Sequence, residues 1–334
     1  MDSLTQIVLG ASVGEVVLGK KAGNKAMLYG AIAGTIPDLD ILSNYFTDVI
    51  TANEFHRGFT HSILFAVIFA PIFGWIISKI EKKLAIDWLD WTKLMFWGLF
   101  THPLLDMFTT WGTELFWPAN YRIAFKTIFV VDPLYTVPFL IFTILAACRP
   151  KGSLSRRKLN TVGLQLSCFY LFCVSVPLKL YADNAFQKTL DAQKIDYRDI
   201  IAKPTPFNTI LWSANVDTKD AYLIGNYSVL DGRPISFNRY PKNRELAKSF
   251  KRYPDFRRLE ELSKGWYTLT KEGDDIYFND LRFGTLNPTN PDSEFVFRYQ
   301  LKEKNGALQV TEVEKDRGDA KRMLRGLFKR MHGN

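Results

Sequence analysis

The order of apolar and polar positions divides the chain into two unlike parts. Residues 1 to about 182 hold nearly all of the long apolar runs, whereas residues 185–334 alternate polar residues with aliphatic and aromatic ones. Long apolar runs predict buried or membrane helices, and short alternating runs between turn residues predict strands. The pattern predicts an α-helical membrane bundle followed by a small α+β, mainly antiparallel, soluble domain. We assign residues 1–183 to the membrane part, 184–206 to a linker and 207–334 to the soluble domain.

About six membrane-associated helices are predicted in the first part. The clearest is Ser62–Ile80, which is rich in Ile, Phe and Val and carries no charge before Lys79; a membrane-crossing helix needs about 20 apolar residues. The first two segments are shorter and rich in small residues, which allow helix backbones to approach closely. The six segments are Met1–Leu18, Ala26–Ile36, Ser62–Ile80, Leu94–Phe108, Thr127–Cys148 and Thr161–Tyr181.

The second part shows the pattern of short strands between turns. Helices are predicted near Arg244–Phe250 and Phe256–Ser263, between two groups of strands. A basic helix is predicted at Lys321–Met331; its apolar side could lie on an anionic membrane surface or pack on its own domain. The predicted strands are Thr209–Ala214, Ala221–Val229, Gly265–Thr270, Asp275–Leu281, Glu294–Tyr299 and Leu308–Val313.

Lysine and arginine gather in three loops between the predicted helices, at Lys20–Lys25, Lys79–Lys93 and Arg149–Lys158. Short loops rich in these residues stay on the cytoplasmic side of a membrane. Alternation of six helices places all three loops on that side, so the soluble domain is predicted outside. The net charge of +9 is of the kind that basic loops give a membrane protein, and no nucleic-acid recognition motif accompanies it. We therefore expect no nucleic-acid partner.

Candidate metal ligands are concentrated in the first third of the chain. Three of the four histidines lie there, and His102 and Asp106 are four residues apart, which puts both on one face of a helix. Imidazole nitrogens and carboxylate oxygens are ligands of zinc and, where carboxylates dominate, of manganese or magnesium. We predict a divalent metal site at one membrane face, with zinc first and manganese or magnesium as alternatives. The predicted ligands are His56, His61, His102, Asp106, Asp38 and Asp40.

Three further residues are candidates for catalysis at such a site. Asp132 and Glu54 could orient or deprotonate a water molecule. Arg57 could bind an anionic substrate, because its planar guanidinium matches phosphate and carboxylate. Taken singly, an aspartate at a helix end is more often a cap, and Arg57 could contact a lipid headgroup. A metal-free ion or proton pathway is the alternative for the whole set, because ionisable groups beside membrane helices mark function.

Five ordered motifs resemble the YdjM-type family of membrane-bound metal-dependent hydrolases. The motifs lie at Met1–Gln6, Pro37–Asp40, His56–Ser62, His102–Asp106 and Asp132–Pro133. The resemblance implies a multi-pass hydrolase of a bacterial inner membrane, with a distant likeness to zinc-dependent phospholipase C and P1 nuclease. The family commonly has histidine where this chain has Gln6. Either position 6 is not an essential ligand or the site is depleted.

Two functions remain open from the sequence. The first is a metal-dependent hydrolase that acts on a phosphoester or acyl ester of a lipid or lipid-linked substrate at the outer face of the membrane, with membrane lipids as partners. The alternative is a non-enzymatic membrane protein that uses a structural metal, in envelope stress or transport, and recruits partners through its C-terminal domain. Transport is less favoured, because the polar residues gather at helix ends and not at mid-membrane depth.

Overall fold

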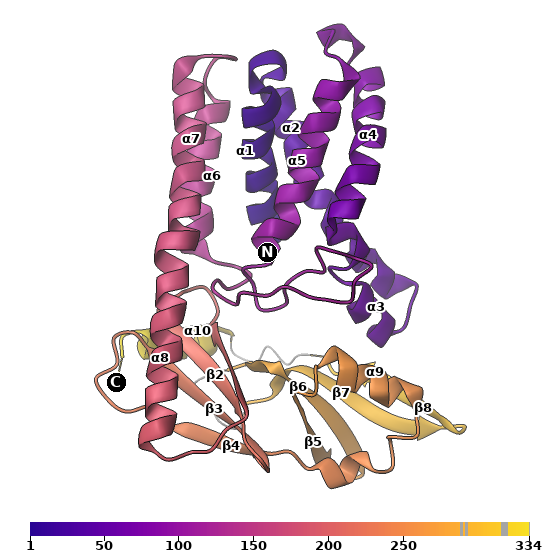
Figure 1. Ribbon diagram of the computed structural model, residues 1–334, viewed down its shortest axis with the longest axis vertical. Helices are drawn as coiled ribbons and strands as arrows, with labels where there is room; N and C mark the ends of the chain where they lie inside the picture. The colour runs from indigo at the N-terminus through magenta and orange to yellow at the C-terminus, as the bar shows by residue number, and fades with distance from the viewer. Residues whose placement is uncertain (288–289, 291–292, 315–319, 334) are drawn as a thin grey trace. The chain divides into compact units, whose positions relative to one another are not determined.

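A computed structural model of the chain describes residues 1–287, 290, 293–314 and 320–333. The chain forms two compact units (Figure 1). Unit 1 comprises Met1–Tyr45, Phe55–Pro177 and Pro206–Asn208, and unit 2 comprises Phe46–Glu54, Leu178–Thr205 and Thr209–Asn334. The chain therefore enters unit 2 three times, first for the nine residues Phe46–Glu54, between the predicted ligands Asp40 and His56.

Unit 1 is helical, and its long helices lie side by side (Figure 1). Several begin at a side-chain cap, as at Asp2, Ser62, Asp87 and Ser153, where an oxygen accepts a hydrogen bond from the first turn and satisfies an otherwise unpaired backbone N–H. The long helices are α1 (Ser3–Ala22), α2 (Asn24–Thr35), α4 (Ile63–Ile80), α5 (Trp88–Asp106), α6 (Pro133–Ala147) and α7 (Leu154–Phe169), and the 3₁₀ segments are η1 (Ile36–Tyr45), η2 (Phe59–His61) and η3 (Lys82–Leu84). Helix α7 continues through a π-helical turn, η4 (Tyr170–Ser175), into α8 (Val176–Ala192).

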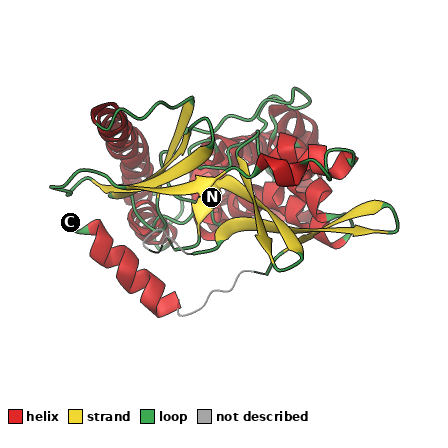
Figure 2. Cartoon of the chain, turned by 90° about the horizontal axis from the view of Figure 1, so that it is seen from below, coloured by secondary structure: helices red, strands yellow, loops and turns green. Residues whose placement is uncertain are grey.

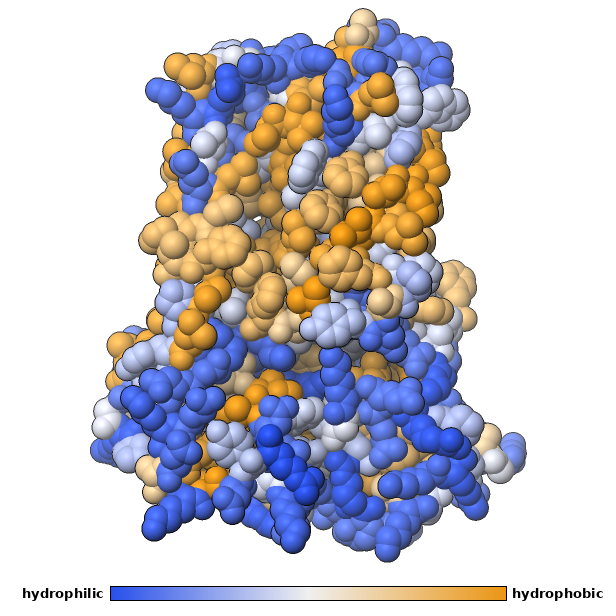
Figure 3. Space-filling view, in the orientation of Figure 1, coloured by the Kyte–Doolittle hydropathy of each residue, from blue (hydrophilic) through white to orange (hydrophobic). Residues whose placement is uncertain are grey.

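The predicted count of six membrane helices is not supported, although helices do form at all six predicted segments. In the described part of the chain, two helical segments are long and apolar enough to cross a membrane, Ile63–Ile80 and Leu154–Ala192. Helix α2 has 12 residues and α6 has 15, below the length that a crossing needs. Helices α1 and α5 are long enough, but polar and charged residues lower their hydropathy. Figure 3 shows apolar side chains gathered over the helices of unit 1.

Helices α1 and α2 approach each other through glycines. A Cβ atom at Gly30 would clash with the carbonyl oxygen of Gly10, and a Cβ at Gly34 would clash with that of Gln6. Small residues allow such contact between helix backbones. The hydrophobic core around these helices also includes Trp91 and Leu94 of α5, which are fully buried. The close approach fixes the start of α1 against the end of α2.

Unit 2 contains two four-stranded antiparallel sheets, with the strand orders β1-β2-β3-β4 and β5-β6-β7-β8. This confirms the predicted antiparallel α+β domain, which Figure 2 shows by secondary structure. The first sheet comprises β1 (Asp199–Pro204), β2 (Leu211–Asp217), β3 (Ala221–Ser228) and β4 (Phe237–Pro241), and the second comprises β5 (Tyr267–Glu272), β6 (Asp275–Thr285), β7 (Phe295–Lys304) and β8 (Ala307–Glu312). The other elements are α3 (Val49–Phe55), η5 (Arg244–Ala247), α9 (Pro254–Leu262) and α10 (Ala320–Met331).

Three segments of unit 2 differ from the sequence prediction. Residues 184–206 were predicted as a linker that begins with a polar helical stretch at Asn184–Arg198. The helix is present as the end of α8, but strand β1 follows it, and Phe186 of α8 is fully buried among the apolar residues of the first sheet. Strand β4 was not predicted, because its residues are mostly polar and exposed. Residues 46–54 were assigned to the membrane part, but Ile50 packs in the core of the second sheet. Apolar burial of Phe186 and Ile50 accounts for the first and third of these placements, whereas β4 is placed by its backbone pairing with β3.

Substitution of Gly30 by alanine should destabilise the protein, because the added methyl group must displace the α1 backbone. Overpacking of this kind costs about 1–3 kcal/mol. We expect a lower midpoint of thermal unfolding for Gly30→Ala than for the wild type, measured by circular dichroism in detergent. The matched control is Gly232→Ala, since a Cβ there meets no atom within 4 Å. Equal midpoints for Gly30→Ala and Gly232→Ala would contradict the packing described here.

Candidate metal centre

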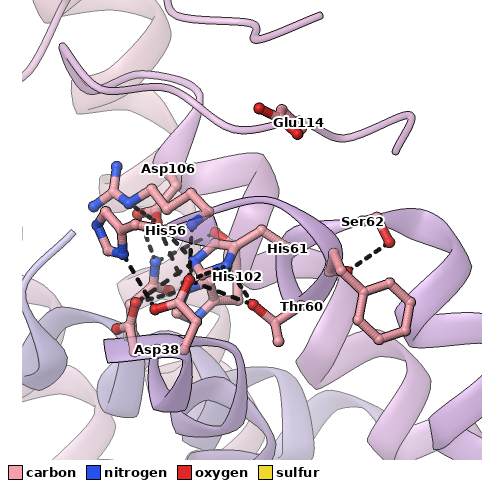
Figure 4. Close-up of polar contacts among 12 residues, drawn as sticks. Asp38, His56, Thr60, His61, Ser62, His102, Asp106 and Glu114 are labelled. Atoms are coloured by element: carbon pink, nitrogen blue, oxygen red, sulfur yellow. Dashed lines mark hydrogen bonds and ion pairs between the residues drawn. The ribbon is translucent and has the colours of Figure 1, made fainter. Parts of the chain in front are cut away.

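Four predicted ligands converge at one end of the unit 1 helices (Figure 4). Asp38 comes from η1, just after α2, and His61 ends η2, just before α4. His102 and Asp106 lie in the last turns of α5, four residues apart, so both face the same side. His61, His102 and Asp106 are fully buried, whereas the Asp38 side chain keeps 21% of its exposure. Solvent can reach the cluster on the Asp38 side.

The ligand atoms are spaced as a metal ion would require. The Nε2 atoms of His61 and His102 are 3.1 Å apart. Asp38 Oδ1 lies 3.5 and 3.4 Å from these two nitrogens, and Asp106 Oδ2 lies 3.5 and 3.6 Å from them. All four ligand atoms are within 4.8 Å of one another. Metal–ligand bonds of about 2.0–2.1 Å in a tetrahedron give ligand–ligand distances of about 3.3–3.4 Å, so five of the six separations already suit one ion.

Hydrogen bonds orient both imidazoles toward the centre. His102 Nδ1 lies 2.6 Å from the carbonyl oxygen of Gly34, and it must donate, because a carbonyl can only accept. His61 Nδ1 lies 3.1 Å from Thr60 Oγ1 and 3.5 Å from Asp40 Oδ2. In the neutral rings, the Nε2 lone pairs then point at each other and at two carboxylates. The repulsion between these lone pairs and carboxylates must be relieved by a bound cation or by an extra proton on one of the groups.

The contacts of the two Asp106 carboxylate oxygens indicate whether a metal ion suits the cluster. Its Oδ1 accepts a hydrogen bond from Gln6 Nε2 at 2.9 Å and contacts the amino group of Met1. Its Oδ2 faces the cluster and is buried. Arg57 Nε lies 3.1 Å from it as an ion-pair partner, yet this oxygen accepts no hydrogen bond within the described residues. A buried carboxylate oxygen without such a bond is costly unless a charge or metal ion compensates it. The donor set and this oxygen therefore fit a divalent metal ion.

Asp40 and His56, also predicted as ligands, lie beside the cluster of four. Asp40 Oδ1 is 3.1 Å from His56 Nδ1, and its Oδ2 accepts a hydrogen bond from the backbone N–H of Arg57 at 2.7 Å. Together with the approach to His61 Nδ1, these contacts make Asp40 a support that orients two imidazoles. Carboxylates behind a ligating histidine commonly set its tautomer and raise its basicity.

The local electrostatics keep the two aspartates charged. Burial by itself would raise the pKa of Asp38, but the close approach of the His102 and His61 imidazoles outweighs it and holds the pKa well below its ordinary value. Burial also opposes ionisation of Asp40, but the hydrogen bonds from His56 and from the Arg57 backbone N–H outweigh it and lower the pKa overall. Burial lowers the pKa of His56 in spite of Asp40. At neutral pH the site therefore holds two charged aspartates beside a neutral His56.

Arg57 was predicted to bind an anionic substrate, and the structure gives its side chain partners within the protein. It is buried, its Nη1 donates to Thr109 Oγ1 at 2.8 Å, and its Nε lies 3.1 Å from Asp106 Oδ2. Its backbone has a positive φ of 60°, a conformation uncommon outside glycine. These contacts position Asp106.

Glu54 and Asp132, the predicted candidates for a general base, have other partners. Glu54 belongs to unit 2, where both carboxylate oxygens accept hydrogen bonds from Arg258, at 3.0 and 2.6 Å. Asp132 caps α6 and accepts a hydrogen bond from the Tyr170 hydroxyl at 2.8 Å. Among the contacts of the described residues, neither carboxylate meets the cluster of four. Their ordinary structural roles, a surface ion pair and a helix cap, account for both.

Three further residues support the centre, and the sequence drew attention to one of them, Gln6. Gln6 belongs to an N-terminal motif, and its Nε2 donates both to Asp106 and to the carbonyl oxygen of His102, the latter at 3.2 Å. An imidazole at position 6 would stand beside Asp106 as the amide does. Gly34 and Thr109 act through a backbone carbonyl and a hydroxyl, groups that are too common in sequences to signal a site.

Comparison with known proteins gives two matches. A sequence model of the YdjM inner membrane protein family matches residues 1–181. Inner membrane protein YbcI of Escherichia coli (strain K12) is 38% identical over 104 residues, which are 30% of this chain and 57% of that protein. The chain thus spans little more than half the length of this curated relative. No solved structure matches the chain, so the distant likeness to zinc-dependent phospholipase C and P1 nuclease is not shown.

Removal of a ligating imidazole should remove the metal. We expect elemental analysis of detergent-purified protein to find about one equivalent of zinc or manganese in the wild type and almost none in His61→Ala or His102→Ala. The matched control is His332→Ala, because His332 is exposed and bonds only locally, to the carbonyl oxygen of Phe328. Wild-type protein that stays metal-free after reconstitution, or metal retained in both ligand variants, would contradict the assignment.

Asp40→Asn should weaken metal binding without abolishing it, because it removes the charge behind His61 and leaves all four ligand atoms in place. Loss of such a support typically lowers metal affinity ten- to a hundredfold. Competition with a chromophoric chelator measures this ratio. An affinity equal to that of wild type would show that Asp40 does not orient the imidazole.

Proposed function

Because the chain belongs to the YdjM inner membrane protein family, we propose that it is a membrane-bound, metal-dependent hydrolase. The substrate class is a phosphoester or acyl ester of a lipid or lipid-linked molecule. The observation that carries the proposal is the convergence of Asp38, His61, His102 and Asp106 on one point, with solvent access beside Asp38. A divalent ion held there would lower the pKa of a water molecule and polarise a phosphoryl or acyl oxygen.

The residues around the cluster have two proposed roles, positioning of a ligand and proton transfer. Arg57 and Gln6 hold Asp106 in place. His56 is the proposed general base, in place of Glu54 and Asp132: its Nδ1 faces Asp40, its ring lies 6.3 Å from that of His61, and its side chain is 32% exposed. With Nδ1 donating to Asp40, Nε2 can take a proton from an attacking water molecule and pass it to the leaving oxygen.

The proposed location of the site is the outer face of the inner membrane, with the C-terminal domain on the same side. Support comes from the direction of the helices in unit 1. The cluster lies at the start of α1 and α4 and at the end of α2 and α5, whereas Lys21, Lys25 and Arg156 lie at the opposite ends. The turn between α1 and α2 bonds there to Asp90 and Glu81. Basic turns favour the cytoplasmic side, which leaves the cluster outside in a multi-pass protein.

A structural metal in a non-enzymatic membrane protein is the alternative, and one observation favours it. Four protein ligands can complete a tetrahedral shell by themselves, as in structural zinc sites, whereas catalytic zinc keeps an open position. On that alternative the C-terminal domain would recruit partners in an envelope-stress or transport role. Hydrolysis requires an ion of higher coordination number or the release of one carboxylate.

The test is an ester screen with metal-loaded, detergent-purified protein. The substrates are a phospholipid phosphodiester, a lipid-linked phosphomonoester and a lipid acyl ester, each with zinc, manganese or magnesium. We expect hydrolysis of at least one class and its loss in His61→Ala. His56→Gln should retain metal and lower kcat about 10²- to 10⁴-fold, the usual contribution of a general base.

The matched control for the base is Glu54→Gln, whose exposed carboxylate pairs with Arg258 and should not affect kcat. Folded, metal-loaded protein that cleaves none of the three ester classes would contradict the hydrolase and favour the structural metal. A normal kcat for His56→Gln would exclude His56 as the base while leaving the hydrolase in place.

A further inference from the structure

Unit 2 contains a pocket that lies entirely within its own residues and is lined mainly by basic side chains. Its volume is about 340 Å³. The charged residues that line it are Arg198, Lys219, Lys242, Arg244, Lys264 and Asp217. We call this the basic pocket. Five positive groups thus face a cavity large enough for a small ligand, against one negative group.

The topology of the first sheet explains why distant basic residues meet there. In an antiparallel meander, the start of one strand lies beside the end of the next. Arg198 precedes β1, Lys219 follows β2 and Lys242 follows β4, so all three lie at the same end of the sheet. Backbone hydrogen bonds confirm the neighbourhood: Arg198 N–H donates to the carbonyl oxygen of Asp217 at 2.7 Å, and Lys242 N–H donates to that of Asp220 at 3.1 Å.

The single carboxylate in the lining already has a cation. Asp217 Oδ1 lies 2.5 Å from Lys242 Nζ, and the same ammonium donates to the carbonyl oxygen of Thr218 at 2.5 Å. Lys242 is mostly buried and its Nζ lies 4.8 Å from the Tyr222 ring centroid. The other basic side chains therefore give the cavity a positive potential, which attracts anions.

Arg244 is held as a preformed anion-binding group. Its guanidinium carbon lies 3.4 Å from the centroid of the Tyr267 ring, and its Nη2 donates to the Tyr222 hydroxyl at 3.0 Å and to the carbonyl oxygen of Gly265 at 2.9 Å. Its Nη1 is buried and donates no hydrogen bond in the described part of the chain. A buried donor without an acceptor is costly, and an anion in the pocket would satisfy it.

The walls of the pocket are rigid and favour a small anion over a nucleic-acid strand. Tyr222 and Trp266 are 2% and 8% exposed, and their ring centroids are 5.5 Å apart. Burial raises the pKa of Tyr222 to about 12, so its hydroxyl stays protonated at neutral pH. Single-stranded nucleic acids stack their bases on exposed aromatic rings, which these two residues do not provide.

We infer that the basic pocket of unit 2 binds a phosphate-bearing anion, either a phosphomonoester or a phosphodiester. A guanidinium with a fixed planar fork, surrounded by ammonium groups, matches the several oxygens and the charge of phosphate. A lipid headgroup and a free phosphate compound share this chemistry. The inference does not depend on the metal centre or on the proposed hydrolase, since the lining residues all belong to unit 2.

Isothermal titration of the full-length protein in non-ionic detergent tests this inference with two probes. One is glycerol 3-phosphate, a free phosphomonoester, and the other is a short-chain phosphatidylglycerol, a lipid phosphodiester, kept below its critical micelle concentration. We expect saturable binding of at least one probe. Arg244→Gln should weaken it roughly ten- to a hundredfold, because charge-assisted hydrogen bonds to a fixed guanidinium are lost. The preferred probe distinguishes a free phosphate compound from a lipid headgroup.

Two further variants keep the result interpretable if Arg244→Gln unfolds. Lys219→Gln changes an exposed lining residue and should weaken binding about two- to fivefold. Lys271→Gln removes the same charge from an exposed position outside the lining and should bind like wild type. Wild-type protein that binds neither probe would overturn the inference, and so would binding that Arg244→Gln and Lys219→Gln leave unchanged, since the anion would then lie elsewhere.

Discussion

Two imidazole nitrogens and two carboxylate oxygens face one another at the end of the unit 1 helices, and this arrangement requires positive charge at its centre. The two Nε2 atoms are 3.1 Å apart, a distance at which two lone pairs repel unless a cation or a proton lies between them. Arg57 and the amino group of Met1 compensate Asp106 from one side. Arg57 Nε lies 3.1 Å from the inner oxygen, Oδ2, which nevertheless accepts no hydrogen bond among the described residues. This oxygen can therefore also face a cation in the cluster.

The packing of the helices is what makes the convergence possible. Gly34 lies so close to α1 that a side chain there would clash with the carbonyl oxygen of Gln6. The same residue offers its own carbonyl oxygen to His102 Nδ1, while Gln6 reaches Asp106. One close helix contact therefore brings together two supports of the centre. Small residues between α1 and α2 serve the chemistry as well as the fold, since a looser contact would change the orientation of both ligands on α5.

The basic pocket of unit 2 suits an ion of the opposite charge and is built in a different way. The candidate metal centre gathers aspartate and histidine side chains in a buried place, where desolvation makes an uncompensated charge costly. The basic pocket gathers cations at the edge of a sheet, with a stacked arginine and a buried tyrosine as its fixed parts. Each needs an ion of the opposite sign, and each draws its residues from segments that lie far apart in the sequence.

The sequence by itself determined the class of structure and the composition of the centre. Apolar runs located every long helix of unit 1, alternation located six of the eight strands, and the rarity of histidine drew attention to His56, His61 and His102. These signals are local, because hydrophobic period and residue chemistry are properties of short segments. The predicted number of membrane helices is not supported, since only two helical segments of the described residues are long and apolar enough to cross a membrane.

Tertiary structure alone decided which candidates act together. It brought four of the predicted ligands together and placed Asp40 and His56 beside them. It also showed that Glu54 forms an ion pair with Arg258 and that Asp132 caps helix α6. It also assembled the basic pocket from strand ends, where the individual lysines and arginines resemble any solvated surface. The physical reason is the same throughout: a ligand set depends on distances of a few ångströms between segments, and only long-range packing establishes such distances.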